Sequence, residues 1–279
     1  MGDAEWERRG FTDPNTPHLF CTNKDVQCHN CACIKKLKTP IAFIRAEHTG
    51  KGSSGTKDTA QGLAASLYLA VGAKVLVTIN VAQPAGICNG SFGIVTEIVY
   101  DADVRPPALP RFVLVDLGDL YTGPSFFPDR PERRGWVPIH PVETSWQTPD
   151  SDHNFVDHSR KMLPLTTAWA FTIWKGQGQT FTGPVVLDIG KDEREHGLAY
   201  VAFSRATRFS NIGIANGVYF DRLTRKIKNQ SKMKCRLLHE KHLENLFQDT
   251  ILAMDGYTYI PSNPSNIVIF IIFLLFLKK

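Results

Sequence analysis

Two stretches decide the fold: LPLTTAWAFTIWKGQGQTF, residues 163–181, and AYVAFSRATR, residues 199–208. Between them, Pro184 to Gly190 form an apolar run that is typical of a buried strand. A Lys, a Gln and two Gly close the first stretch, and an Arg closes the second. In an α/β fold this spacing places Lys175, Gln177 and Arg205 at one edge of a sheet, where phosphates are usually held.

The pattern after Pro164 alternates between helix and strand signals. It predicts a short helix over 168–178, a strand over 185–189, a helix over 193–207 and a strand over 212–215. Tyr200, Val201 and Phe203 are expected to pack on the sheet. Strands that alternate with helices imply a parallel, doubly wound sheet.

The middle of the chain has the signals of short strands. We predict strands over 76–79, 92–100 and 111–117, and a short edge strand over 136–140 because it contains Pro138. Asn89-Gly90 is a two-residue hairpin signal. Short strands joined by Gly and Pro turns favour a small barrel or sandwich.

The order T-I-x-K-x-Q-G-x-T-F, strand, G-L-A-Y-V-A-F-S-R-A resembles motifs V and VI of superfamily-one helicases of the Pif and RecD type. Residues 71–95 are similar to the region of the Pif-type family where a small barrel is inserted. The resemblance covers roughly residues 37–250. It implies an α/β fold in which the second RecA-like domain, a parallel doubly wound sheet, carries an inserted β-barrel, while the first RecA-like domain is absent.

The resemblance also implies a division of the chain into segments. These are an N-terminal segment of poorly defined structure (1–36), the entry to the second RecA-like domain with a Gly/Ser linker (37–70), the inserted barrel (71–160), the core with motifs V and VI (161–220), a basic amphipathic helix (221–260) and an apolar tail (261–279).

Helicases of this type hydrolyse ATP with Mg²⁺ between two RecA-like domains, translocate 5′-to-3′ on single-stranded DNA and unwind duplexes. The resemblance therefore implies single-stranded or forked DNA as partner, no small-molecule substrate other than ATP, and a nuclear (alternatively mitochondrial) role in DNA repair, recombination and telomere maintenance. Arg205 is the implied catalytic arginine that reaches the γ-phosphate. The implied nucleotide-binding residues are Gln177, Gly178, Arg205 and Arg208, and the implied DNA-binding residues are Thr172, Trp174, Lys175 and Asn89.

Two positions depart from the family pattern T-I-H-K-S-Q-G, since this chain has Trp174 and Gly176 in place of the His and the Ser. The family His is implied to contact the DNA backbone. Trp174 either stacks on a base, a contact worth about 1–3 kcal/mol, or packs inward and weakens the DNA contact.

A phosphate loop is the motif that this sequence lacks. Gly50 to Lys57 lie between a strand-like run, 41–46, and a helix-like run, 59–70, but Thr56 and Lys57 stand in the inverse of the required Lys-Ser/Thr order. A flexible Gly/Ser linker is the better interpretation. We therefore expect the C-terminal half of a helicase that hydrolyses ATP poorly alone. The alternatives are a catalytically inactive, helicase-derived nucleic-acid-binding module and a β-rich protein-interaction domain.

The amino-acid composition is compatible with each of these alternatives. The 279 residues are 43% hydrophobic and 21% charged, which is typical of globular proteins, and the net charge of +5 is compatible with a nucleic-acid partner. Residues 1–10 show no secretory signal, so a reducing compartment is expected. Cys28 and Cys31 have the spacing of zinc ligands, but no second half-site follows, and we predict free thiols and no metal site.

The C-terminal region is first basic and then apolar. Basic residues from Arg222 to Lys241 are expected to form a solvated face, with a patch that binds a nucleic-acid backbone as the alternative. Leu243, Leu246, Phe247 and Ile251 follow at helical spacing. The apolar run from Ile267 to Leu277 is shorter than the roughly 20 residues that a membrane span needs, so no membrane partner is predicted.

Overall fold

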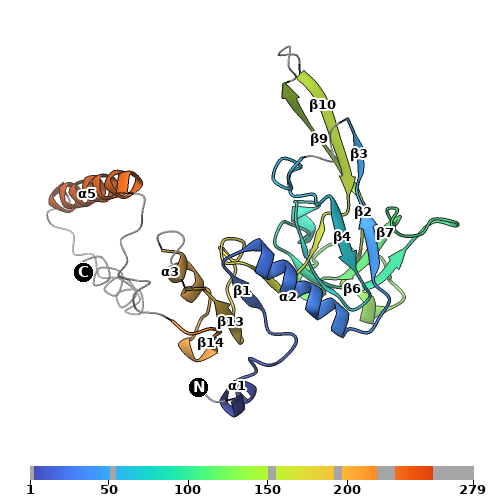
Figure 1. Ribbon diagram of the computed structural model, residues 1–279, viewed down its shortest axis with the longest axis horizontal. Coiled ribbons are helices and arrows are strands. Elements are labelled where there is room, and N and C mark those ends of the chain that lie inside the picture. Colours follow the sequence, from blue (N-terminus) through green and yellow to red (C-terminus); the bar gives the residue numbers. More distant parts are fainter. Residues whose placement is uncertain (1–2, 51–54, 150–154, 192–196, 219–229, 254–279) are drawn as a thin grey trace. The chain divides into compact units, whose positions relative to one another are not determined.

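The computed structural model describes residues 3–50, 55–149, 155–191, 197–218 and 230–253, within two compact units, Met1–Arg225 and Lys226–Lys279. The first unit is a mixed α/β structure that combines a parallel sheet with antiparallel sheets (Figure 1). The second unit contains one described helix, α5 (Gln230–Ala253).

The parallel sheet has four strands in the order β12-β1-β13-β14. Their bounds are Ala170–Thr172 (β12), His18–Phe20 (β1), Val185–Asp188 (β13) and Ile212–Ile214 (β14). Leu19, Ile173, Val185 and Leu187 are completely buried and form the centre of its core. The predicted strands over 185–189 and 212–215 and the parallel sheet are confirmed.

The N-terminal segment contributes directly to this sheet. α1 (Asp3–Arg8) precedes β1, and α2 (Asn23–Lys36) follows it with Thr22 as N-cap. β1 pairs on one side with β12 and on the other with β13. Residues 1–36 were expected to be poorly defined, and this expectation misses β1 because its three residues are too few to show a periodic signal.

The helix predicted over 168–178 is wrong. Residues 170–172 form β12, and turns follow from Ile173 to Gly178. Ala170 and Phe171 are buried, and a continuously buried apolar run shows neither the helical nor the strand period. Pairing with β1, which is distant in sequence, decides the strand.

The helix predicted over 193–207 is shorter in the structure. α3 comprises Leu198–Phe203, and 192–196 lie outside the described residues. Leu198, Ala199 and Ala202 are its buried residues, and Val201 and Phe203 pack beside them. Tyr200 was expected on the sheet, but it is 53% exposed because it lies on the opposite face of the helix.

The antiparallel part is built from three sheets, ordered β11-β5-β6-β7-β8, β3-β10-β9 and β2-β4. β9 and β10 form a hairpin that projects beyond the other strands (Figure 1). The strand bounds are Ala42–Arg45 (β2), Glu47–Thr49 (β3), Ser66–Leu69 (β4), Lys74–Val77 (β5), Phe92–Val99 (β6), Phe112–Asp116 (β7), Trp136–Ile139 (β8), Val142–Pro149 (β9), Phe155–Met162 (β10) and Leu165–Thr167 (β11).

Most of the predicted strands in this region are confirmed. β6 and β7 lie within 92–100 and 111–117, and β8 is the edge strand that Pro138 required. The strand expected over 76–79 begins earlier, at Lys74. β2 confirms the strand-like run at 41–46.

Two local predictions in this region are wrong. Asn89 and Gly90 do form a turn, in which Ser91 N donates to Cys88 O, but residues 78–91 connect β5 and β6, so they are not a two-residue hairpin. The helix-like run 59–70 contains turns and then β4, whose residues are alternately exposed and buried. That alternation is the period of a strand.

The second unit confirms a helix in the basic C-terminal region. Leu237, Leu238, Leu243 and Leu246 on α5 are each about half exposed or more. Residues 219–229, with Arg222 and Arg225, and the apolar run 267–277 lie outside the described residues. Among the helices that the structure describes, none has the length and apolar character to cross a bilayer.

Candidate functional site

The segment that follows β12 is a compact series of turns. Lys175 N donates to Thr172 Oγ1 at 3.2 Å, and Gly176 N donates to Thr172 O at 3.0 Å. Gln179 N then donates to Gly176 O at 3.0 Å. Thr172 therefore caps the first turn. We call residues 172–181 the motif V segment.

The motif V segment presents its large polar and aromatic side chains to solvent. Trp174 is 43% exposed, and Lys175 and Gln177 are also exposed. Gly178 has φ of +90°, a conformation that an L side chain rarely adopts. Trp174 therefore does not pack inward, which was one of its two alternatives.

Lys175 and Asn89, predicted from distant parts of the chain, meet in the structure. Lys175 Nζ donates to Asn89 Oδ1 at 3.1 Å. Beside them, Gln179 Nε2 donates to Gly90 O at 3.4 Å. These contacts join the motif V segment to the connection between β5 and β6. Burial lowers the pKa of Lys175, and the negative charge of Asp58 partly opposes that effect.

Arg205 lies beyond the end of α3, against the other end of the motif V segment. Its Nε donates to Val201 O at 3.1 Å, its Nη1 to Gln179 O at 3.4 Å and its Nη2 to Ser204 Oγ at 2.9 Å. The backbone is tied there as well, because Phe181 N donates to Arg205 O at 2.8 Å. Arg205 was expected at the end of a helix, and it follows Ser204, the C-cap of α3.

The guanidinium of Arg205 is held by neutral groups. Within the part of the chain that the structure describes, none of the ion pairs includes Arg205. Asp188, the carboxylate that could have paired with it, instead accepts from Gly190 N and from Asn216 Nδ2. Asp192, the other possible partner, lies outside the described residues.

Arg208 is not one helical turn beyond Arg205, as the predicted longer helix implied. α3 ends at Phe203, and Arg208 is extended, with φ of −138°, at the start of a 3₁₀ turn. Its side chain is exposed. Arg205 and Arg208 therefore do not share a helix face.

Asn30 on α2, to which no sequence motif pointed, holds the chain that leads into the motif V segment. Asn30 is 5% exposed, accepts from Ala170 N at 2.8 Å and donates to Ala170 O at 3.0 Å and to Thr167 O at 3.2 Å. The only indication of it in the sequence was an Asn among Cys residues.

The same helix carries exposed Cys28 and Cys31, and no cluster of three metal-ligating side chains occurs in the described ranges.

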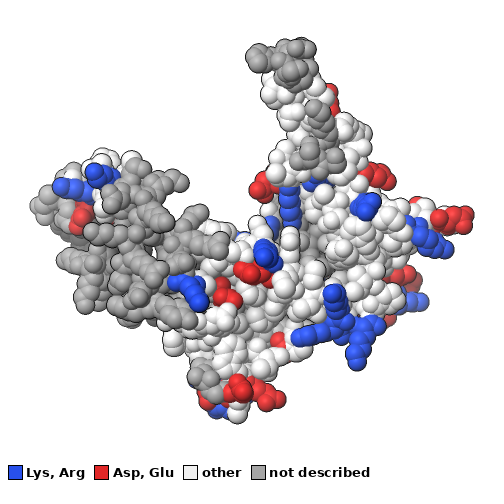
Figure 2. All heavy atoms as spheres, in the orientation of Figure 1, with Lys and Arg blue, Asp and Glu red and all other residues white. Residues whose placement is uncertain are grey.

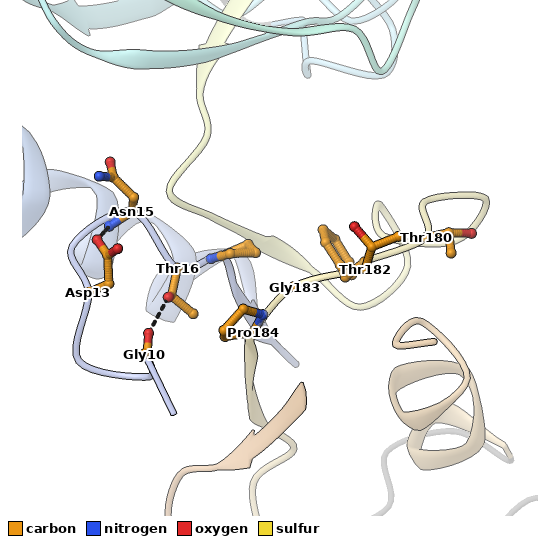
Figure 3. A pocket seen from close by; sticks show the side chains of 10 residues that line it. Gly10, Asp13, Asn15, Thr16, Thr180, Thr182, Gly183 and Pro184 are labelled. Carbon is orange, nitrogen blue, oxygen red and sulfur yellow. Dashed lines mark hydrogen bonds between the residues drawn. The ribbon is translucent and has the colours of Figure 1, made fainter. Parts of the chain in front are cut away.

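A polar hollow of about 370 Å³ lies where β1 and β13 begin. Figure 3 shows Asp13, Asn15 and Thr16 on one wall and Thr180 and Thr182 on the other. Asn15 N donates to Asp13 Oδ1 and Thr16 Oγ1 to Gly10 O, so the wall of Asp13, Asn15 and Thr16 is hydrogen-bonded internally. Sequence analysis did not predict this hollow.

Basic side chains also gather where α2 ends (Figure 2). The last turn of that helix contains Lys35 and Lys36, and exposed Lys38 follows. Cations at a helix C-terminus are stabilised by the helix dipole. This cluster therefore has a structural explanation.

The comparisons with known proteins agree with the motifs. The chain is 28% identical over 196 residues to the ATP-dependent DNA helicase PIF1 of Danio rerio, which covers 70% of this chain. It is 28% identical over 211 residues to PIF7 of Trypanosoma brucei, and 42% identical over 71 residues to PIF1 of Candida albicans. The chain is related to the Pif1 DNA helicases. No protein-family profile matches it.

The solved Pif1 structures have a similar fold. The Candida albicans Pif1 helicase matches with a TM-score of 0.54 at 24% identity, over 83% of this chain and 51% of that one. A Bacteroides Pif1 in complex with ADP-AlF3 and ssDNA matches with a TM-score of 0.55 at 20% identity, over 82% and 46%. The chain spans about a quarter of the zebrafish relative, 26%, and 20% of the trypanosome one.

Proposed function

We propose that the first unit is the second RecA-like domain of a Pif1-type motor, with a small barrel inserted between α2 and β11. The parallel sheet with α2 and α3 supports the RecA-like assignment, and the antiparallel strands between them support the insertion. β1 and α2 then belong to the RecA-like domain, because β1 lies inside its sheet.

The proposed activity is that of the C-terminal portion of an ATP-dependent 5′-to-3′ DNA helicase. One observation carries it: the motif V segment contacts Asn89 through Lys175 at one end and Arg205 through Gln179 at the other. A conformational change caused by a nucleotide near Arg205 can therefore be transmitted through this one segment to a DNA strand near Lys175. Thr172 acts as its cap, and Gln177 and Gly178 lie between the two ends.

ATP is proposed to meet this chain at Arg205. A guanidinium that has no carboxylate partner among the described residues suits the charge that develops on a transferring γ-phosphoryl group. Arg208 is the second candidate for this contact with ATP, because its side chain is exposed and it lies close to Arg205 in the sequence. The Mg²⁺ ligands are proposed to come from another RecA-like domain, because no cluster of metal-ligating side chains occurs within the described residues.

The DNA partner is proposed to be single-stranded or forked. A Bacteroides Pif1 of similar fold was solved with single-stranded DNA, and exposed Trp174 beside Lys175 offers a stacking surface and a cation. Because the similar PIF1 proteins come from eukaryotes, we propose a nuclear, alternatively mitochondrial, role in DNA maintenance. A catalytically inactive nucleic-acid-binding module is the second candidate, favoured by the absence of a phosphate loop from the 279 residues.

The first prediction is that the purified chain binds a labelled oligo(dT) and loses affinity when the motif V segment is altered. Lys175→Gln removes a cation that can contact a phosphate, and Trp174→Ala removes a stacking surface. The stacking contact is worth about 1–3 kcal/mol, or roughly 5- to 160-fold in the dissociation constant. Fluorescence anisotropy at several salt concentrations measures this. Exposed Lys24 on α2 provides the matched control, Lys24→Gln, which should bind like the unaltered chain. Equal affinity of all four proteins would refute the DNA role of this segment.

A further inference from the structure

The outer face of β2 and β4 carries two neighbouring aromatic rings. The two strands pair in antiparallel register and lie side by side (Figure 1). Phe43 on β2 is directly opposite Tyr68 on β4, and their ring centroids are 4.9 Å apart. On the other face Ile44 and Leu67 are buried, whereas Tyr68 is 50% exposed and Phe43 is partly exposed. The strands therefore present an apolar face to the core and an aromatic face to solvent.

A cation lies beside this pair of rings. The guanidinium carbon of Arg45 is 5.3 Å from the centre of the Phe43 ring, which is a cation–π distance. Arg45 is exposed, and among the described residues it belongs to none of the ion pairs. Its backbone is fixed, because Arg45 N donates to Pro107 O at 2.8 Å. The guanidinium is therefore placed where it can meet an anion next to the rings.

The chain that leads to this face carries charge of one sign. Residues 26–46 contain no Asp or Glu, and their cations are Lys35, Lys36, Lys38 and Arg45. The dipole of α2 accounts for the two lysines of its last turn, but Lys38 and Arg45 lie beyond the helix. The first acid after β2, Glu47, lies 3.7 Å from Lys161 in an ion pair. The charge of this face therefore suits a polyanion.

Lys38 has a backbone conformation that a lysine rarely adopts. Its φ is +56°, and it directly follows Leu37, the C-cap of α2. Glycine is the usual residue at this position, because it has no Cβ to resist the left-handed conformation. Strained backbone of this kind is concentrated at functional sites. A lysine in a place that suits glycine therefore points to a use for its exposed cation.

We propose that the outer face of β2 and β4 binds a single-stranded nucleic acid. Unpaired bases stack on Tyr68 and Phe43, and Arg45 and Lys38 contact phosphates. Exposed rings on a sheet surface stack bases that are unpaired, whereas the bases of a duplex are stacked on one another. This surface shares no residue with the motif V segment, so the inference adds a second contact to the proposed function.

Photocrosslinking locates the contact directly. The second prediction is that ultraviolet irradiation of the chain with oligo(dT) crosslinks the peptide that contains Tyr68, because a stacked base touches the ring. Mass spectrometry of the digest identifies the peptide. The crosslink should persist in Trp174→Ala, which alters the other surface, and Phe155, which is 71% exposed on β10, should not be crosslinked. Crosslinks confined to peptides outside β2 and β4 would overturn the proposal.

Binding by variants gives an independent measurement. In a Trp174→Ala background, which removes stacking at the motif V segment, Tyr68→Ala should raise the dissociation constant for labelled oligo(dT) by roughly 5- to 160-fold. Arg45→Gln should lower the slope of log K against log salt by about 0.7, the share of one phosphate on a single strand. The matched controls Phe155→Ala and Lys24→Gln should change neither quantity.

Lys38→Gly separates binding from folding. Glycine adopts a φ of +56° without steric cost, so this variant should unfold at no lower urea concentration than the unaltered chain. It should nevertheless lose about 0.7 of the salt slope, because it lacks the cation. Unchanged slopes in both Lys38→Gly and Arg45→Gln would refute the phosphate contacts.

The outcomes separate this inference from the proposed function. If Trp174→Ala and Lys175→Gln weaken binding and Tyr68→Ala does not, the proposed function stands and the second contact is refuted. If only Tyr68→Ala weakens binding, the second contact is supported and the DNA role of the motif V segment fails. No binding of oligo(dT) by the unaltered chain would refute both. Loss of binding to phosphatidylserine vesicles in Tyr68→Ala, with oligo(dT) binding unchanged, would assign the face to a membrane surface instead.

Discussion

Trp174 and Gly176 are the residues at which this chain departs from the Pif-type motif, and local packing accounts for one of them. Gly176 is buried, and a Cβ there would lie 3.2 Å from Leu19 Cδ2 and 3.3 Å from Ile173 O. A Ser there would need the Leu19 methyl group and the Ile173 carbonyl to move by a few tenths of an ångström. Trp174 points to solvent, where it costs nothing in packing and offers a surface to a partner.

His29 is the residue whose titration should affect stability. Its ring lies 4.1 Å from that of His18, and its pKa is lowered to about 4, first by burial and then by His18 and Lys36. The folded protein therefore binds fewer protons than the unfolded chain between about pH 6.5 and pH 4. The stability that neutral His29 contributes is complete above pH 6.5 and is lost as the pH falls towards 4.

The third prediction follows from this linkage. Between pH 7 and pH 4 the free energy of unfolding should fall more in the unaltered chain than in His29→Gln, by on the order of 1–2 kcal/mol after solvent screening. Urea unfolding at several pH values measures it. His239→Gln on α5, where His239 is exposed, is the control. Parallel pH profiles of the unaltered chain and His29→Gln would contradict the prediction.

Among the elements, α2 fixes the strand that precedes the motif V segment. Asn30 completes hydrogen bonds of Ala170 and Thr167 that neighbouring strands do not supply. Since a buried backbone group without a partner costs about 1–3 kcal/mol, the attachment of β12 depends on this one amide.

The fourth prediction is that Asn30→Ala destabilises the first unit by about 2–4 kcal/mol, because it leaves Ala170 N and two carbonyl groups unpaired. Chemical denaturation measures the loss. Gln27→Ala changes an exposed residue of the same helix and should cost less than about 0.5 kcal/mol. If both variants unfold at the same denaturant concentration, the amide does not hold β12.

The catalytic groups that the whole chain contains predict whether it can hydrolyse ATP alone. Its 279 residues contain no phosphate loop, and the order of Thr56 and Lys57 is inverse to that of the motif. In the proposed function, Arg205 would supply only the part of an ATP site that acts in the transition state.

The fifth prediction is that the chain alone shows no DNA-stimulated ATP hydrolysis above background. Fused to a phosphate-loop domain of a Pif1 relative, it should support hydrolysis, and Arg205→Ala should then lower turnover by about 10³-fold while nucleotide binding persists. A phosphate-release assay with and without oligo(dT) measures this. Arg208→Ala is the comparison, and a larger loss there would move the catalytic role to Arg208. Hydrolysis by the chain alone that disappears in Lys57→Ala would revive the phosphate loop.

Several parts of the fold were predictable from local patterns. The strands β6, β7, β8 and β13 have alternation, an edge proline or an apolar run bounded by glycine and proline. The order of motifs V and VI predicted the similarity to the Pif1 helicases. Such signals are local, because each depends on residues that are neighbours in the chain.

Local patterns along the chain predicted the relationship to the Pif1 helicases, half of the described strands and the candidate residues Arg205, Lys175 and Asn89. Two features follow only from the folded chain: residues 170–172 form a strand, and Asn30 on α2 holds that strand. Both depend on partners far apart in sequence, because β12 pairs with β1 and the Asn30 amide pairs with Ala170. No periodicity within a short window records a contact that the folded core creates.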